Sequence, residues 1–146
     1  MKRGGRRGHT MVEFAMAYLI LFTMFTGAVQ FGRTYFVYNN LLTAVRAGAR
    51  YASLRTFDSG TGSPSQDYTT AVCNTVLYGN PAGGTVALVS GLTATNVNVS
   101  VTVANNVPTA VTVSIQSFTM DALFARFTFN AKPKVTLPYL GRYAPA

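Results

Sequence analysis

The side chains that could do acid–base, nucleophilic or metal chemistry are few and mostly far apart in the sequence. The chain has one histidine, one cysteine and four acidic residues: His9, Cys73, Glu13, Asp58, Asp67 and Asp121. An enzyme needs several such groups to converge on one site, and no zinc-protease, nucleophile-elbow, P-loop or dinucleotide-binding motif is present. A lone cysteine indicates a small buried side chain, although an intermolecular disulfide stays open. We therefore expect a structural or assembly protein with no catalytic residue, no metal and no cofactor.

Glu13 is the acid whose position asks for an explanation. It stands at the start of an apolar run, where a carboxylate is retained more readily with a cationic partner. It could also lie at the membrane interface and stabilise the start of a helix through the macrodipole. If the chain is cut after Gly8, His9 gains a free α-amino group four residues before Glu13. That amine could pair with the carboxylate of the same or a neighbouring chain, and mispaired charges among apolar helices are costly enough to favour one register.

The charge distribution points to a membrane and away from nucleic acid. The chain is 49% hydrophobic and only 11% charged, with a formal net charge of +8. The first seven residues hold four of its twelve basic side chains: Lys2, Arg3, Arg6 and Arg7. The other basic residues are scattered, and no nucleic-acid-binding motif accompanies them. We expect no nucleic-acid partner and interpret the basic cluster as a topology signal that holds the N-terminus in the cytoplasm.

The apolar run is long enough to cross a membrane. Residues 14–29 carry no charge, and the neighbouring residues extend the segment to about 12–31, close to the ~20 residues that a span needs. We therefore expect a single-pass transmembrane helix. A cleaved secretory signal peptide is the alternative, with Thr26-Gly27-Ala28 as a weak cleavage site. The helical pattern continues past residue 28, which argues against it.

A helical period continues beyond the apolar run. Apolar residues recur at steps of three and four: Tyr38, Leu41, Leu42, Val45, Ala49 and Ala52. Arg46 and Arg50 lie four residues apart on another face, which we interpret as a solvated basic face, with contacts to neighbouring subunits as the alternative. One helix is predicted from about His9 to Tyr51 or a little beyond, within a helical region of residues 9–56. Its amphipathic second half is expected to cover a globular domain of residues 57–146.

The remaining chain predicts a short helix followed by strands. Ser63 is the expected N-cap, Pro64 the first helical residue, and Gly79 the stop after Tyr78. Valines then alternate with polar residues over 97–103 and 111–115, joined by a hairpin connection at residues 104–108. Weaker strand candidates are residues 85–89, 126–130 and 134–137. The fold class is α+β: a long N-terminal helix packed on a small antiparallel sheet of three to five strands.

The N-terminal motifs resemble a known family. The segment GHTMVEF resembles the prepilin peptidase site of type IV pilin-like proteins, with His9 where conventional pilins usually have phenylalanine. The fuller resemblance is to the TadE-like minor pilins, or pseudopilins, of Flp/Tad-type pili, and it covers about the first 55 residues. The residues that carry it are Gly8, Glu13 and Phe14, then Phe31, Gly32 and Arg33, then Arg46, Gly48, Ala49 and Arg50.

The resemblance implies a prepilin-type life cycle. Residues 1–8 would be a leader that prepilin peptidase removes between Gly8 and His9, lowering the net charge from +8 to +4. The mature helix would then leave the inner membrane and pack with other pilin subunits in a pilus, in the periplasm or outside the cell, or in its initiating complex. Two alternatives stay open: an uncleaved, membrane-anchored binding or adhesion module, and a secreted enzyme whose mature chain starts near Val29.

Overall fold

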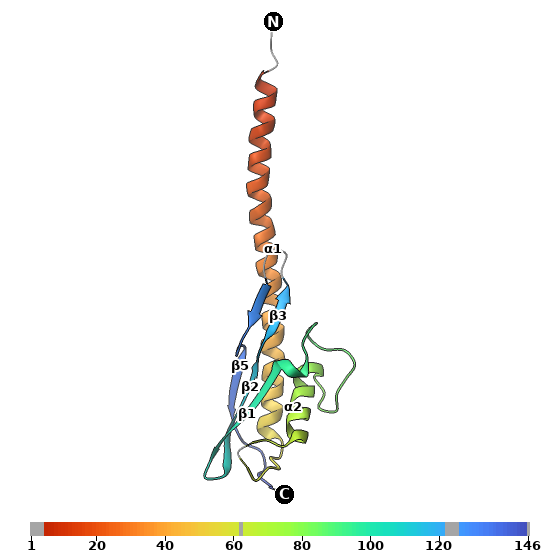
Figure 1. The fold of residues 1–146 in the computed structure, drawn as a ribbon, viewed down its shortest axis with the longest axis vertical. Coiled ribbons are helices and arrows are strands. Elements are labelled where there is room, and N and C mark those ends of the chain that lie inside the picture. The colour runs from red at the N-terminus through yellow and green to blue at the C-terminus, as the bar shows by residue number, and fades with distance from the viewer. Residues whose placement is uncertain (1–4, 62, 122–125, 146) are drawn as a thin grey trace. The chain divides into compact units, whose positions relative to one another are not determined.

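The computed structural model describes residues 5–61, 63–121 and 126–145. The chain divides into two units, residues 1–36 and 37–146. Helix α1 (Gly5–Leu54) contributes to both units, and all the other helices and strands belong to the second (Figure 1). This architecture confirms the expected α+β class with a long, apolar N-terminal helix. The helix begins four residues before the expected start at His9.

The first unit consists of the apolar part of α1. Large apolar side chains cover its surface, among them Met11, Phe14, Leu21 and Phe31, all more than half exposed. By length and composition, α1 from Gly8 to Leu54 is the one helix of the described residues that could cross a membrane. Its threonines also suit an apolar environment: the hydroxyl of Thr23, for example, donates to the carbonyl of Leu19 at 2.6 Å, one turn back. The helix therefore satisfies this polar group internally.

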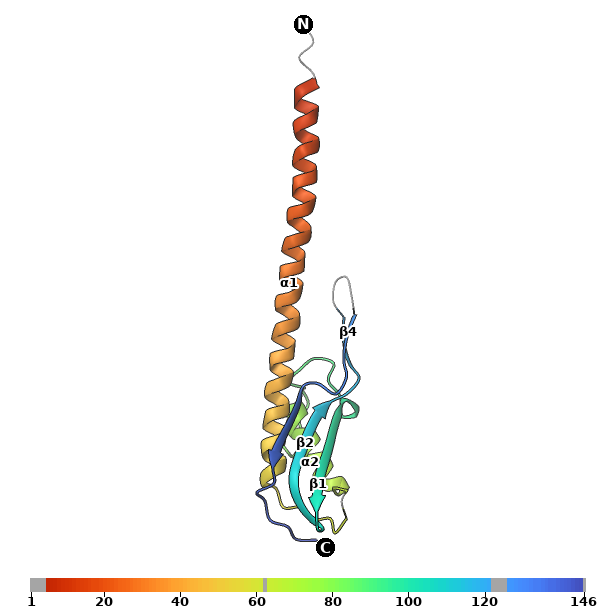
Figure 2. The same ribbon diagram turned by 90° about the vertical axis from the view of Figure 1, so that its left-hand side faces the viewer.

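The second unit is built around the rest of α1 and helix α2 (Gln66–Tyr78). Four residues of the predicted inward face of α1 are completely buried, namely Leu41, Val45, Ala49 and Ala52. The other two, Tyr38 and Leu42, are only partly buried. On α2, Val72, Val76 and Leu77 are buried as well. These side chains share one hydrophobic core with the valines of the sheet, and both helices lie alongside the sheet (Figure 2).

The N-cap of α2 differs from the expectation. The cap is Ser65, whose hydroxyl accepts a hydrogen bond from the backbone N–H of Tyr68 at 3.1 Å. Ser63 was therefore the wrong serine: the helix starts two residues later than predicted, so Pro64 precedes the cap. The predicted stop is correct, because Gly79 caps the C-terminus in the left-handed conformation with φ of 71°.

The strands form two antiparallel sheets. Strands β1 (Val97–Ala104), β2 (Val107–Ile115) and β5 (Lys134–Pro138) form the larger sheet in the order β1-β2-β5. Strands β3 (Phe118–Asp121) and β4 (Arg126–Phe129) pair separately. The hairpin between β1 and β2 turns at Asn105 and Asn106, which both have positive φ, as the two central residues of a type I′ turn require.

The strand predicted for residues 85–89 was wrong. These residues follow α2 as an irregular segment without a strand partner. The N–H of Leu88 donates to the carbonyl of Leu77 at 2.7 Å, so the segment is tied to the end of α2. Val89 is buried. A β-prone composition did not produce a strand because the backbone bonds to a helix end and the side chain fills the core.

Candidate assembly site on the long helix

His9 and Glu13 lie one helical turn apart in α1, and their side chains meet. Nε2 of His9 is 3.1 Å from Oε1 of Glu13, with 80% of the His9 side chain and 60% of the Glu13 side chain exposed. The sequence argument paired Glu13 with a new α-amino group on residue 9. The structure adds the imidazole of that residue, a partner that the spacing of four residues could have revealed.

Gly8 is unconstrained by the rest of the described chain. A Cβ built on Gly8 would have no heavy atom within 4 Å, and the same holds for Gly32. Both glycines lie inside the helix, where an alanine would be at least as favourable. Neither glycine is therefore required by the fold of the single chain. A requirement for glycine at either position would come from a partner molecule.

The expected motif residues at the other positions of the first unit lie on its surface. Phe14 is 70% exposed and Phe31 is 74% exposed, while Arg33 is also exposed. Apolar side chains in this number are costly in water but suit lipid or the apolar faces of other helices. This surface is therefore suited to contact lipid or other apolar helices. Glu13 is the one acidic side chain on it.

The second motif separates into buried and exposed residues. Gly48 and Ala49 are buried, whereas Arg46 and Arg50 are exposed. A Cβ on Gly48 would lie 2.2 Å from Cγ2 of Val76, so only glycine lets α2 approach α1 this closely. The sequence correctly placed the two arginines away from the core. It could not show the contact with Val76, which is far along the chain.

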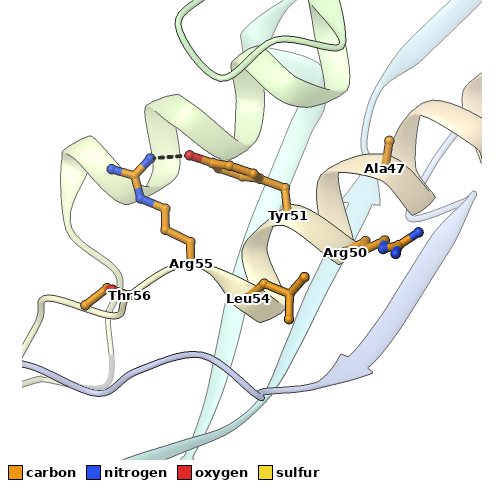
Figure 3. A pocket seen from close by; sticks show the side chains of 6 residues that line it. All are labelled: Ala47, Arg50, Tyr51, Leu54, Arg55 and Thr56. Atoms are coloured by element: carbon orange, nitrogen blue, oxygen red, sulfur yellow. Dashed lines mark hydrogen bonds between the residues drawn. The ribbon is translucent and has the colours of Figure 1, made fainter.

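An open pocket of about 670 Å³ lies at the C-terminal end of α1. Figure 3 shows its lining residues: Ala47, Arg50, Tyr51, Leu54, Arg55 and Thr56. Nη1 of Arg55 donates to the hydroxyl of Tyr51 at 2.9 Å. Arg50 points away from that pair (Figure 3). The sequence analysis did not single out Arg55, although its spacing of four residues from Tyr51 is a helical contact distance.

A buried tyrosine lies beneath this end of the helix. The guanidinium of Arg55 stands 5.9 Å from the ring centre of Tyr68, whose hydroxyl donates to the carbonyl of Ala52. Burial raises the pKa of Tyr68 far above its ordinary value, with a smaller contribution from nearby Tyr139. A neutral, hydrogen-bonded tyrosine of this kind fastens α2 to α1, so its role is structural.

The other chemically reactive side chains do not assemble into a site. Cys73 is buried in the core, and burial raises the pKa of its thiol, which makes it a poor nucleophile. Asp121 pairs with Arg126 at 2.8 Å on the surface of the β3–β4 hairpin. Among the described residues, no three His, Cys, Asp or Glu side chains group closely enough to hold a metal ion.

The chain thus combines a long helix, whose first part is apolar, with a small α+β domain. Residues 8–50 match the model of a family described as TadE-like protein. The match contains the motif residues from Gly8 to Arg50 and confirms the resemblance inferred from the sequence. The match ends at Arg50, within α1, and covers less than half of the chain. Comparison with curated proteins gave no match, and comparison with solved structures gave none either.

Proposed function

We propose that this chain is a pilin-like structural subunit, of the minor pilin or pseudopilin kind, that is processed by a prepilin peptidase. Cleavage between Gly8 and His9 removes the basic leader. The mature helix then leaves the inner membrane, where its N-terminus faced the cytoplasm, and packs against other pilin subunits. The product is a Tad or type IV-like pilus, or the complex that initiates one.

The observation that carries this proposal is the combination of the family match and the surface of α1. The match covers the N-terminal motif and most of the helix. The apolar part of α1 exposes large side chains along its length and carries a single acid, Glu13. In a span that only anchored a domain, that acid could do no more than lie at the membrane interface and stabilise the start of the helix through the macrodipole. Among identical apolar helices, however, Glu13 would fix the axial register, because an unpaired carboxylate in that environment is costly.

The first test is the N-terminal residue and intact mass of the protein recovered from its native envelope. A chain beginning at His9 supports the proposal, and a chain retaining its leader supports the uncleaved anchor instead. Gly8→Val is the companion variant, and Gly32→Val is its matched control because both glycines have open space around them. We expect only the Gly8 variant to stay unprocessed.

A second test addresses assembly directly through Glu13. Glu13→Val makes the segment more apolar, so the chain should insert in the membrane as before. It should still be cut, but its share in sheared filaments should fall strongly. Glu13→Gln keeps the shape and a hydrogen-bonding group while removing the charge. Normal incorporation of both variants would contradict charge pairing as the role of Glu13.

A further inference from the structure

The pocket at the C-terminal end of α1 combines apolar and cationic side chains. Its four residues within the helix recur at steps of three and four and therefore share one face: Ala47, Arg50, Tyr51 and Leu54. Arg55 follows directly after the helix and extends the lining. The volume of about 670 Å³ is that of a site for a small ligand or for a few side chains of a peptide.

The guanidinium of Arg55 is held in place within this pocket. Its Nη1 donates to the hydroxyl of Tyr51 at 2.9 Å, and its Cζ lies 5.8 Å from the ring centre of Tyr51 and 5.9 Å from that of Tyr68. The backbone beneath it is fixed as well, because the hydroxyl of Tyr139 lies 2.8 Å from the carbonyl oxygen of Arg55 and accepts from the N–H of Phe57. A cation fixed in this way loses little conformational freedom when it binds an anion.

Neither arginine of the pocket pairs with a carboxylate in the part of the chain that the structure describes. The ion pairs found there lie in the first unit and on the β3–β4 hairpin. Asp58, the acid nearest to Arg55 in the sequence, forms no ion pair with either arginine. Arg50 is exposed and points away from the Arg55–Tyr51 pair (Figure 3). The pocket therefore has a cation on each of two sides and an apolar surface between them.

The charge of the second unit favours an acidic partner over a second copy of the chain. From residue 37 to residue 146 the sequence contains seven basic and three acidic side chains, which is a net charge of +4. A second copy has the same positive excess, so repulsion disfavours it as the occupant. A nucleic acid would need an open aromatic face on which its bases stack. Tyr51 is only partly exposed, and the guanidinium of Arg55 lies over its ring.

We propose that this pocket binds an acidic segment of a different protein, in which carboxylates flank an apolar side chain. One carboxylate bonds to Arg55 and another to Arg50, since guanidinium groups form strong, paired hydrogen bonds with carboxylates. The apolar side chain covers Leu54, which is 58% exposed in the single chain. This surface goes beyond the proposed function and does not depend on cleavage behind Gly8.

The test measures how a short fluorescent peptide binds to the full-length chain in a neutral detergent. The peptide has one central leucine with glutamates on both sides, and two matched peptides replace the glutamates by glutamine or the leucine by serine. Fluorescence anisotropy is recorded at low and high salt, because salt screens exposed charges. The pocket variants are Arg50→Gln, Arg55→Gln and Leu54→Ser. Arg46→Gln is the matched control, since Arg46 is exposed on the same helix but does not line the pocket.

We expect each pocket variant to weaken binding of the glutamate–leucine peptide roughly fivefold or more. Arg46→Gln should change it by no more than about twofold. High salt should weaken binding to the wild-type chain, and both matched peptides should bind less well. Protection of the buried Cys73 thiol shows that a variant is folded. If Arg55→Gln exposes that thiol, the variant of the exposed Arg50 decides the result.

Three results would overturn the inference. The first is that the glutamate–leucine peptide does not bind, or that Arg46→Gln weakens its binding as much as Arg50→Gln does. The second is that single-stranded DNA displaces the peptide at a lower concentration than unlabelled peptide does, which would assign the pocket to nucleic acid. The third is self-association of the wild-type chain that Arg50→Gln and Arg55→Gln abolish, which would assign the pocket to a second copy. None of these results bears on processing behind Gly8.

Discussion

Replacing Gly48 by alanine should loosen the contact between α1 and α2. The new Cβ would lie 2.2 Å from Cγ2 of Val76, 3.6 Å from Cβ of Val76 and 3.7 Å from the carbonyl oxygen of Val72. Val76 is fully buried. Its branched side chain also has one strongly preferred rotamer in a helix, so it cannot turn away cheaply. Relief of the clash therefore requires the two helices to move apart.

Two opposing terms decide the size of the effect. Overpacking a well-packed core costs about 1–3 kcal/mol. Replacing glycine by alanine inside a helix stabilises the helix by about 1 kcal/mol. The free energy of unfolding should therefore fall by a net ~1 kcal/mol, which corresponds to a roughly fivefold larger unfolded fraction.

The accessibility of the Cys73 thiol can be used to measure this effect. It is the chain's one cysteine, it lies on α2 in the same core, and it is buried. Labelling with a thiol reagent in mild detergent therefore reports the opening of this unit in the full-length chain. We expect Gly48→Ala to be labelled roughly five times faster than wild type, in proportion to its unfolded fraction. Gly32→Ala, with open space around its Cβ, should be labelled at the wild-type rate.

A second substitution checks the cause. Val76→Ala removes both Cγ atoms and should accelerate labelling by itself, because burial and packing are lost. In the double variant the new methyl group fills space that Val76 has vacated. The combined effect should therefore be smaller than the two single effects together. Slower labelling of Gly48→Ala than of wild type would refute the reasoning, since helix propensity alone would then decide the outcome.

Three further predictions can be checked by the same labelling of Cys73. Ser65→Ala should lower the free energy of unfolding by about 1 kcal/mol because it removes the N-cap of α2, whereas Ser63→Ala should change it little. Tyr139→Phe should lower it by about 1–2 kcal/mol, because it removes a hydroxyl that accepts from the N–H of Phe57 and lies 2.8 Å from two backbone carbonyl oxygens. Burial raises the pKa of Tyr68 from its ordinary 10.0, so unfolded chains lose this proton first as the pH rises. Stability should thus be full below about pH 10 and fall above it, and Tyr68→Phe should reduce that fall.

Local patterns were sufficient to predict much of the secondary structure. The alternating valines of β1 and β2 pair as expected, with Val99 opposite Val113 and Val101 opposite Val111. The predicted strands at residues 126–130 and 134–137 also exist as β4 and β5. Period-two alternation specifies which face of a strand is buried, and that information is local. The same applies to the helical period of α1, which identified four fully buried residues and two, Tyr38 and Leu42, that are only partly buried.

The errors in the predicted secondary structure arose where the sequence offered two similar residues for one role or gave no clear turn signal. Ser63 and Ser65 flank the same proline, and the sequence analysis expected Ser63 as the N-cap with Pro64 as the first helical residue. The structure instead gives Ser65 a bond to the N–H of Tyr68. The division into two sheets was also not foreseen. Ser117 and Ala131, both with positive φ, stand beside β3 and between β4 and β5, and residues of these types carry no strong turn signal.

The motif around Gly48 shows how one short segment can serve two kinds of contact. Its small residues face inward, where Gly48 lets Val76 approach, and its arginines face outward. Substitutions of Gly48 or Ala49 should therefore change the stability of the single chain, measured by exposure of Cys73. Arg46 and Arg50 are exposed, and substitutions at exposed positions usually change the free energy of unfolding by no more than about 0.5 kcal/mol. A loss of assembly caused by either arginine, with Cys73 still protected, would therefore identify a contact to another subunit and not a defect of folding.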